Sequence, residues 1–307
     1  MNRSRIQEAA LSNEEAEVLR QWCRQFRGDP YGSDHAEYDR ELHARIDGIP
    51  DKLYQLACWF GDHVGMSGVQ RFRGLPVPRD IPPTPNVPYF QVRAPLGTEP
   101  LLLGISMLVG DAVAFKDWRG GDRVHNIYPL SEDATTQKAS NVVRLAMHTE
   151  TAFHPEAPEA LAILCLRDGI SQPPVTGFCD LHPLWDDLEA GDRSLLRESG
   201  FCFSGRHRDG SPFLSEPMPI VTSYRKGLRF HYVDSLLGSS PRHEGALRRL
   251  REGIEQTTVE VTLAPGDLVL IDNLHMVHGR TAVSPRYDGR DRWLQRCLIR
   301  KSAGPYA

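Results

Sequence analysis

The sequence has 307 residues, of which 40% are hydrophobic and 25% are charged, an ordinary composition for a globular chain. Its formal net charge is -4, and no block of lysine and arginine provides the electrostatic footprint of a nucleic-acid-binding protein. No stretch of about 18 apolar residues predicts a membrane span, and the first residues lack the apolar core of a signal peptide.

The N-terminal part of the chain, about residues 1–75, predicts a helical layer. Ser12 is followed three residues later by Glu15, which is a capping-box pattern at a helix start. A second pair of helices is predicted at residues 41–46 and, after Pro50, at residues 53–60. Apolar residues recur at helical spacing after the capping box, at Val18, Leu19, Trp22, Cys23 and Phe26. We expect these helices to pack outside a β-sheet core.

Prolines are dense between residues 76 and 100, with Pro82, Pro83, Pro85 and Pro88 close together. Proline lacks a backbone donor and has a fixed φ, so neither a helix nor a central strand can run through such a segment. We expect an ordered connecting loop over a site or between layers.

Short apolar and β-branched runs separated by turn residues dominate the rest of the chain. The turn Ala264-Pro265-Gly266-Asp267 separates two of them, and helices interrupt the series at residues 184–198 and 243–255. The runs predict strands at residues 101–109, 111–115, 142–147, 160–166, 219–224, 228–232, 258–263, 268–272 and 293–301. This pattern predicts a mainly β fold with flanking helices, a double-stranded β-helix (jelly roll) over about residues 90–301. The length favours one domain over residues 1–307.

The six cysteines are scattered and include no Cys-x-x-Cys pair. In a chain of this size they are typical of reduced packing residues, and not of disulfides or zinc ligands. We therefore expect a cytoplasmic protein.

The pattern most relevant to chemistry is His148-Thr149-Glu150 together with His278. Alternate residues of a strand point to the same side, so His148 and Glu150 could reach one ion. His278 lies beyond the predicted strand 268–272 and a short loop, from which it could supply a third ligand. Two imidazoles and one carboxylate on one face of a metal are the ligands of non-haem Fe(II) oxygenases. A His-x-Glu triplet occurs by chance in many chains, and a hydrogen-bonded buried histidine is the usual alternative.

Three segments provide the context for this triplet: residues 148–154 (HTETAFH), residues 164–167 (LCLR) and the long segment 278–296. Together they resemble the clavaminate synthase-like branch of the Fe(II)/2-oxoglutarate oxygenases, in the TauD-like superfamily, which includes arginine and asparagine 3-hydroxylases. The resemblance covers roughly residues 90 to 300, and both ligand segments agree in residue identity and order. The first ninety residues match only in general character.

The resemblance implies Fe(II) held by the three ligands, 2-oxoglutarate as co-substrate and O2 as oxidant. Arg292, fourteen positions after His278, resembles the arginine that binds the distal carboxylate of 2-oxoglutarate, and Thr176 resembles a hydroxyl beside it. Arg296 resembles the arginine that holds the α-carboxylate of the substrate. Charge counting agrees, because an Fe(II) ion with one protein carboxylate and a dianionic oxo acid leaves one negative charge for a guanidinium to balance. The alternative is that both arginines decorate a solvated β-face.

Glu150 also bears on the predicted reaction. Halogenating members of this group carry a small residue in place of the carboxylate, so that a halide can bind the iron. The resemblance therefore implies hydroxylation of an unactivated C–H bond, or a related oxidation such as desaturation, coupled to conversion of 2-oxoglutarate to succinate and CO2. The predicted partner is a small amino-acid-like substrate, with neither nucleic acid nor membrane expected, and the oligomeric state stays open.

Recognition of the substrate side chain departs from the arginine-hydroxylating members, in which two acidic residues hold the guanidinium because a buried cation requires fixed anions. The corresponding segment here, residues 228–234, offers only Asp234, and His231 stands about where one acid would be. This favours a less cationic side chain. Asp117 and the second carboxylate oxygen of Glu150 are candidate acceptors for the amino group, although Asp117 equally suits a turn before a glycine pair.

Two other classes of protein remain open. A cupin-like binding or regulatory protein could keep a jelly roll and a metal without turnover. A zinc hydrolase could use two histidines and a glutamate with a bound water. It would have no use for Arg292.

Overall fold

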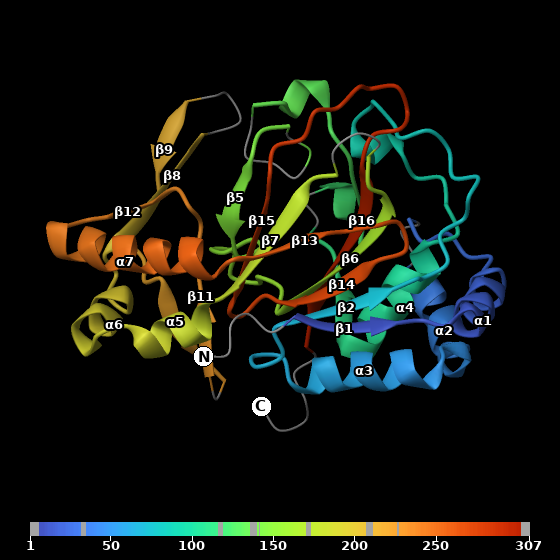
Figure 1. The fold of residues 1–307 in the computed structure, drawn as a ribbon, viewed down its shortest axis with the longest axis horizontal. Coiled ribbons are helices and arrows are strands. Elements are labelled where there is room, and N and C mark those ends of the chain that lie inside the picture. The colour runs from blue at the N-terminus through green and yellow to red at the C-terminus, as the bar shows by residue number, and fades with distance from the viewer. Residues whose placement is uncertain are drawn as a thin grey trace.

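The computed structural model describes residues 6–31, 35–115, 119–135, 140, 142–169, 173–206, 211–225 and 227–301. Two β-sheets occupy the middle of the molecule, and helices lie at both ends (Figure 1). The large sheet has the spatial order β1 (Ile6–Ala10), β2 (Val69–Arg73), β14 (Leu268–Asp272), β6 (Ala160–Arg167), β16 (Trp293–Arg300) and β3 (Asp111–Val113), with β4 (His125–Ile127) also paired to β16. The small sheet has the order β13 (Val259–Thr262), β7 (Val175–Asp180), β15 (Met276–Arg280) and β5 (Leu145–His148). This is the jelly-roll arrangement predicted from the sequence.

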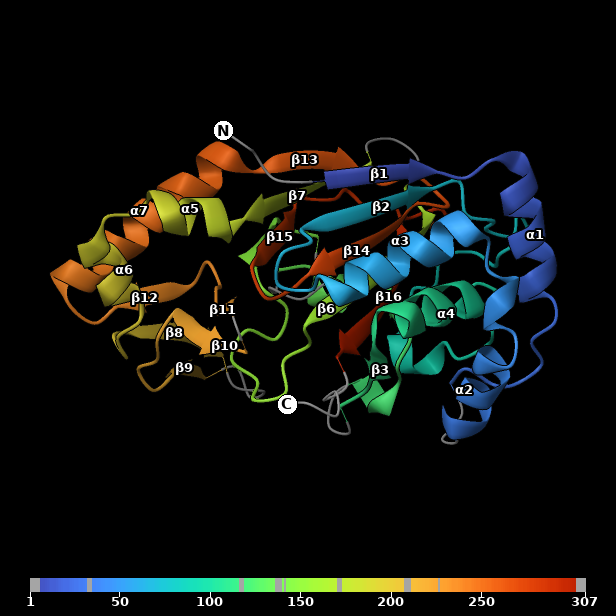
Figure 2. The ribbon, with the colours of Figure 1, turned by 90° about the horizontal axis from the view of Figure 1, so that it is seen from below.

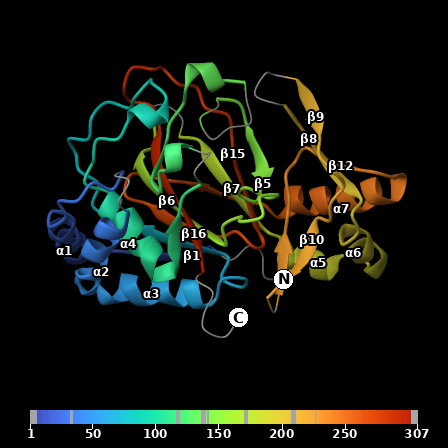
Figure 3. The same ribbon diagram turned by 180° about the vertical axis from the view of Figure 1, so that it is seen from behind.

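The outer elements cover the two sheets on opposite sides, as Figure 2 and the view from behind in Figure 3 show. Four helices pack on the outer face of the large sheet: α1 (Asn13–Cys23), α2 (His35–His43), α3 (Asp51–Asp62) and α4 (Glu99–Val109). The outer face of the small sheet packs against three helices, α5 (Leu181–Asp187), α6 (Ala190–Leu196) and α7 (Pro241–Thr257). Two accessory sheets lie on the same side. One has the order β12 (Leu236–Gly238), β8 (Phe201–Arg206) and β9 (Pro212–Leu214), and the other pairs β10 (Val221–Tyr224) with β11 (Gly227–Phe230). Within the described ranges no helix is both long and apolar enough to cross a bilayer.

The predicted capping box at the start of α1 is confirmed. The backbone N–H of Glu15 donates to Ser12 Oγ at 3.1 Å, and the backbone N–H of Ser12 donates to Glu15 Oε2 at 2.7 Å. These two bonds satisfy donors that the first turn of a helix otherwise leaves without partners.

The strand predicted at residues 101–109 is wrong, because this segment forms α4. Pro100 lies in the first turn, where a missing N–H costs nothing and the fixed φ suits a helix. The helix is apolar on nearly every side because it is buried between α3 on one side and β6 and β16 on the other. A continuous apolar run has no periodicity that separates a buried helix from a buried strand.

The other predicted helices and strands differ from the structure mainly because several strands were not predicted. The N-terminal helices are present, but the same region also contributes β1 and β2 to the large sheet. The helix predicted at residues 184–198 is two helices, α5 and α6, and the strand predicted from residue 142 begins at Leu145. Strands β7 and β15, which carry Thr176 and His278, were not predicted. The proline-rich segment is a loop, apart from the 3-10 turn Tyr89–Gln91, until α4 begins.

A third apolar cluster lies between the two sheets. Phe178 of β7 and Met276 of β15 reach from the small sheet to the large one, where they meet residues of β6, β14 and β16. This inner core fills one part of the space between the sheets, and the remaining part is a cavity of about 590 Å³.

Residues 273–275 join β14 of the large sheet to β15 of the small sheet, and buried charges fix this turn. Asp272 Oδ2 accepts hydrogen bonds from the backbone N–H of Gly65 at 2.5 Å and from Ser67 Oγ at 3.1 Å. The fully buried ring of His275 lies between two carboxylates, with Nε2 at 3.0 Å from Asp272 Oδ2 and Nδ1 at 2.8 Å from Asp180 Oδ1. His275 is therefore buried, and each of its ring nitrogens faces a carboxylate.

The charge of His275 makes the stability of the fold depend on pH. Burial lowers the pKa of this ring, but the carboxylates of Asp272 and Asp180 outweigh burial and raise the pKa from 6.5 to about 10. A group whose pKa is higher in the folded state stabilises the fold fully below its unfolded pKa and loses that contribution as the pH rises through the folded value. We predict that the free energy of unfolding falls between pH 6.5 and about 10, and that His275→Gln removes much of this slope. Urea unfolding of both proteins at a series of pH values measures it, and parallel curves would contradict the prediction.

Candidate metal centre

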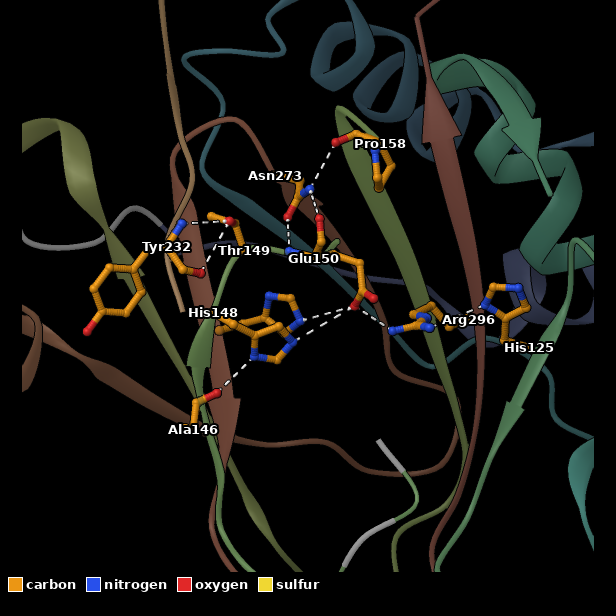
Figure 4. Close-up of polar contacts among 10 residues, drawn as sticks. His125, Ala146, His148, Thr149, Glu150, Pro158, Tyr232, Asn273 and Arg296 are labelled. Carbon is orange, nitrogen blue, oxygen red and sulfur yellow. Dashed lines mark hydrogen bonds and ion pairs between the residues drawn. The ribbon is translucent and has the colours of Figure 1, made fainter. Parts of the chain in front are cut away.

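Three potential ligands, two of them close in sequence and the third from a distant strand, meet on the wall of the cavity. Figure 4 shows two of them, His148 and Glu150, with their polar contacts. His148 is the last residue of β5, Glu150 lies in the turn that follows, and His278 lies opposite His148 in β15. Glu150 Oε2 is 3.9 Å from His148 Nε2 and 4.0 Å from His278 Nε2. The three ligand atoms lie within 4.8 Å of one another, so a single ion can contact all three. Two imidazoles and one carboxylate are the donor set of the non-haem iron facial triad.

Hydrogen bonding and burial prepare both imidazoles as ligands. His148 Nδ1 lies 2.8 Å from the Ala146 carbonyl oxygen, which can only accept, so the proton is on Nδ1 and the Nε2 lone pair is directed towards the site. Burial lowers the pKa of His278 well below its usual value, and His148 and Arg296 lower it further. The lowered pKa of His278 thus favours its neutral, metal-binding form.

The carboxylate of Glu150 is also held by an arginine, which contacts the same oxygen that faces the two histidines. Arg296 Nη1 donates to Glu150 Oε2 at 2.5 Å, and both side chains are buried. Arg296 Nη2 also donates to His125 Nδ1 at 3.3 Å, while His125 Nε2 lies 2.9 Å from the Asp122 carbonyl oxygen. Because that carbonyl accepts, the His125 proton is on Nε2 and Nδ1 is the acceptor for Arg296. His125 was missed at the level of sequence, where its spacing to the other site residues carries no signal.

The other end of the cavity is cationic. Arg292 is buried, and its Nη2 lies 3.5 Å from Thr176 Oγ1. Arg280 lines the same cavity, and burial together with the neighbouring charge of Arg292 lowers its pKa to about 10. Arg280 follows His278 by two residues on β15 and pairs with Thr176 of β7, so it points to the same face as the ligand. Two adjacent buried guanidiniums predict an anion between them.

The cavity lies between the two sheets, with the metal ligands at one end and Arg292 and Arg280 at the other. Apolar side chains form much of its wall, and Leu294 and Arg296 of β16 and Arg292, which directly precedes that strand, also line it. The apolar residues of the wall include Ile127, Leu145, Ile163, Leu263, Val269 and Leu294.

Two of the predicted substrate residues, His231 and Asp234, contact other groups, and the position of the third is not described. Asp117 lies outside the described residues. The ring nitrogens of His231 contact the Ala152 carbonyl oxygen at 2.5 Å and Thr222 Oγ1 at 2.9 Å. Asp234 accepts a hydrogen bond from the Tyr232 hydroxyl at 3.3 Å and lines a different hollow, on the α7 side of the small sheet.

Comparison with known sequences defines the family. A family model described as "Taurine catabolism dioxygenase TauD, TfdA family" matches residues 109–298. An L-asparagine oxygenase from Streptomyces coelicolor is 31% identical over 309 residues, covering 95% of this chain and 89% of that protein. Clavaminate synthase 2 from Streptomyces clavuligerus is 28% identical over 264 residues, covering 82% and 80%. The chain therefore belongs to the TauD/TfdA family of dioxygenases.

Solved structures agree with this assignment. An asparagine oxygenase in complex with Fe(II), 2S,3S-3-hydroxyasparagine and succinate superposes with a TM-score of 0.84 at 26% identity, covering 95% of this chain and 93% of that one. The non-haem iron oxygenase OrfP in complex with Fe and α-ketoglutaric acid superposes with a TM-score of 0.79 at 26% identity, covering 95% and 94%. The protein is a non-haem iron oxygenase that depends on Fe(II) and 2-oxoglutarate. Its family membership decides against the zinc hydrolase.

We predict that Glu150→Ala lowers the affinity for Fe(II) by more than about 100-fold, because changes to groups that merely support a ligand already cost about 10- to 100-fold. Anaerobic titration with Fe(II) measures the dissociation constant. The control is Glu156→Ala, which removes an exposed carboxylate paired with Arg300 on the surface. Equal Fe(II) affinity in Glu150→Ala and the control would exclude Glu150 as a ligand.

Proposed function

We propose that this protein hydroxylates an unactivated C–H bond of an amino acid or amino-acid derivative. The balanced reaction consumes the substrate, 2-oxoglutarate and O2 and yields the hydroxylated product, succinate and CO2. The observation that carries the proposal is one cavity with the three ligands at one end, Arg292 and Arg280 at the other, and Arg296 beside the ligands. Relatives named as an asparagine oxygenase, an L-lysine 3-hydroxylase and an L-ornithine/L-arginine 3-hydroxylase support an amino-acid substrate.

The cationic end of the cavity suits the distal carboxylate of 2-oxoglutarate. Arg292 offers a fork of donors that matches a carboxylate, and the Thr176 hydroxyl lies beside it. Arg280 adds a second buried positive charge. Bound iron with 2-oxoglutarate supplies the oxidising chemistry, and these side chains orient the co-substrate so that its oxo-acid end meets the metal.

Arg296 suits the α-carboxylate of the substrate, because it lines the cavity next to the metal ligands. A substrate held there would have its neighbouring carbon atoms close to the iron. Glu150 and the predicted Asp117 are the acceptors that we assign to the amino group. The assignment does not extend to His231 and Asp234, whose contacts lie elsewhere. The apolar wall of the cavity excludes water from the reacting atoms.

We further propose that residues 1–307 act as one oxygenase domain in the cytoplasm. Strands β1 and β2 of the N-terminal region complete the sheet that carries Arg296, so the two regions share a core. The six cysteines are all free, which supports a reducing compartment. Relatives named clavaminate synthase 2 and enduracididine beta-hydroxylase support a place in specialised, natural-product metabolism.

We predict that the Fe(II)-loaded protein forms succinate from 2-oxoglutarate in proportion to a hydroxylated product when given the right member of an amino-acid panel. Amino acids with neutral polar side chains should be better substrates than arginine, because residues 228–234, where the resemblance places an acid pair for a guanidinium, offer only Asp234. Mass spectrometry for a gain of one oxygen atom measures the product. Loss of two hydrogens instead would identify a desaturase, and no stimulation of succinate formation by any member would contradict an amino-acid substrate.

We predict opposite effects for Arg292 and Arg296. Arg296→Ala should raise the KM of the substrate about 10- to 100-fold and change that of 2-oxoglutarate little, because a hydrogen-bonded charge contributes roughly 1.5–3 kcal/mol. Arg292→Ala should do the reverse. Steady-state kinetics with each compound varied in turn measures both constants, and Arg248→Ala, an exposed position on α7, is the control. Equal effects of both variants on both constants would contradict this division of roles.

A further inference from the structure

We propose that Asn273 is a positioning residue of the metal centre, which sets the place of Glu150 by holding its main chain. Asn273 is the first residue of the turn between β14 and β15 and is buried, with 3% of its surface exposed. It does not touch the three ligand atoms. Its role is therefore to act through the backbone of a ligand.

The side-chain amide of Asn273 pairs with Glu150 in the way that a neighbouring strand would (Figure 4). Its Oδ1 accepts from the backbone N–H of Glu150 at 2.7 Å, and its Nδ2 donates to the Glu150 carbonyl oxygen at 3.1 Å. Nδ2 also donates to the Pro158 carbonyl oxygen at 2.9 Å, and the backbone N–H of Asn273 donates to the Glu159 carbonyl oxygen at 2.9 Å. Both side-chain donor hydrogens of Asn273 are thus used, which fixes the orientation of the amide.

Glu150 needs this support because it lies past the end of the strand ladder. The pairing of β5 with β15 ends at His148, and the following residue, Thr149, donates its N–H to the Tyr232 carbonyl oxygen at 2.9 Å. Thr151 then adopts a φ of 48°, in the left-handed region that β-branched residues rarely enter. Such a conformation costs about 1–3 kcal/mol and persists only where neighbouring contacts enforce it. The bonds to Asn273 hold the backbone immediately before this strained residue.

The same turn also leads directly to the third ligand. His278 lies five residues after Asn273, in β15, and the turn itself is anchored by the bonds of Asp272 and His275 described above. Asn273 thereby connects the segment that carries Glu150 to the segment that carries His278, across 123 residues of sequence. Loss of the amide would leave the N–H and C=O of Glu150 buried without these partners, so the segment would shift to find others.

The test measures the affinity for Fe(II), which does not depend on the identity of the proposed substrate. Asn273→Ala should weaken Fe(II) binding by about 10- to 100-fold, the range found for groups that orient metal ligands. Asn273→Asp keeps the size and the acceptor for the Glu150 N–H but cannot donate to the two carbonyl oxygens when ionised, so it should also weaken binding. Anaerobic titration measures the affinity, and the visible absorption of the anaerobic Fe(II)/2-oxoglutarate complex should shift in both variants.

The control is Gln70→Ala, which removes another buried amide, one that donates to the carbonyl oxygens of Gln7 and Arg71 in the same large sheet. It should lower the thermal stability and leave Fe(II) affinity and absorption unchanged. If Asn273→Ala does not fold, the Fe(II) affinity of Asn273→Asp tests the proposal. Wild-type Fe(II) affinity and absorption in a folded Asn273 variant would overturn the proposal, as would an equal loss of affinity in Gln70→Ala.

Discussion

The pairing of β5 with β15 is the constraint on which the metal centre depends. His148 and His278 are direct partners across these strands, so their imidazoles leave the same face of the small sheet. A slip by one residue would turn His278 to the opposite face. Gly279 makes the close approach possible, because a Cβ there would lie 2.8 Å from the Leu145 carbonyl oxygen and from Met147 Sδ. The register of β5 and β15 therefore determines whether the two histidines can bind the same ion.

The cavity also contains buried arginines, and their charges are balanced differently at its two ends. Arg296 is compensated within the protein by Glu150. Burial lowers the pKa of both Arg280 and Arg292, and the charge of Arg292 lowers that of Arg280 further. Burying like charges together costs free energy that the binding of an anion recovers. The proposed binding of the co-substrate carboxylate at Arg292 would offset this cost.

The contacts that could be predicted from the sequence are mainly those between residues that lie close together along the chain. The ligands His148 and Glu150 are recognisable because they lie two residues apart in sequence, although Glu150 lies in the turn after β5 and not in the strand. The family resemblance pointed to His278, Arg292 and Arg296. Asn273 binds the backbone of Glu150, 123 residues away. No local pattern encodes such a pairing. His125 and Arg280 were missed for the same reason, and α4 was misassigned because complete burial removes the periodicity that distinguishes a helix from a strand.

The N-terminal strands have a consequence for the solubility of the molecule. Strand β14 carries hydrogen bonds on both sides, to β6 and to β2, and β1 in turn covers the far side of β2. A chain shortened to begin after Leu75 would expose the backbone donors and acceptors of β14 along an apolar strand, which is a template for pairing with other chains. Strands β1 and β2 therefore cover one side of the sheet that contains β14 and keep that strand, which leads into the turn of Asn273, from pairing with other chains.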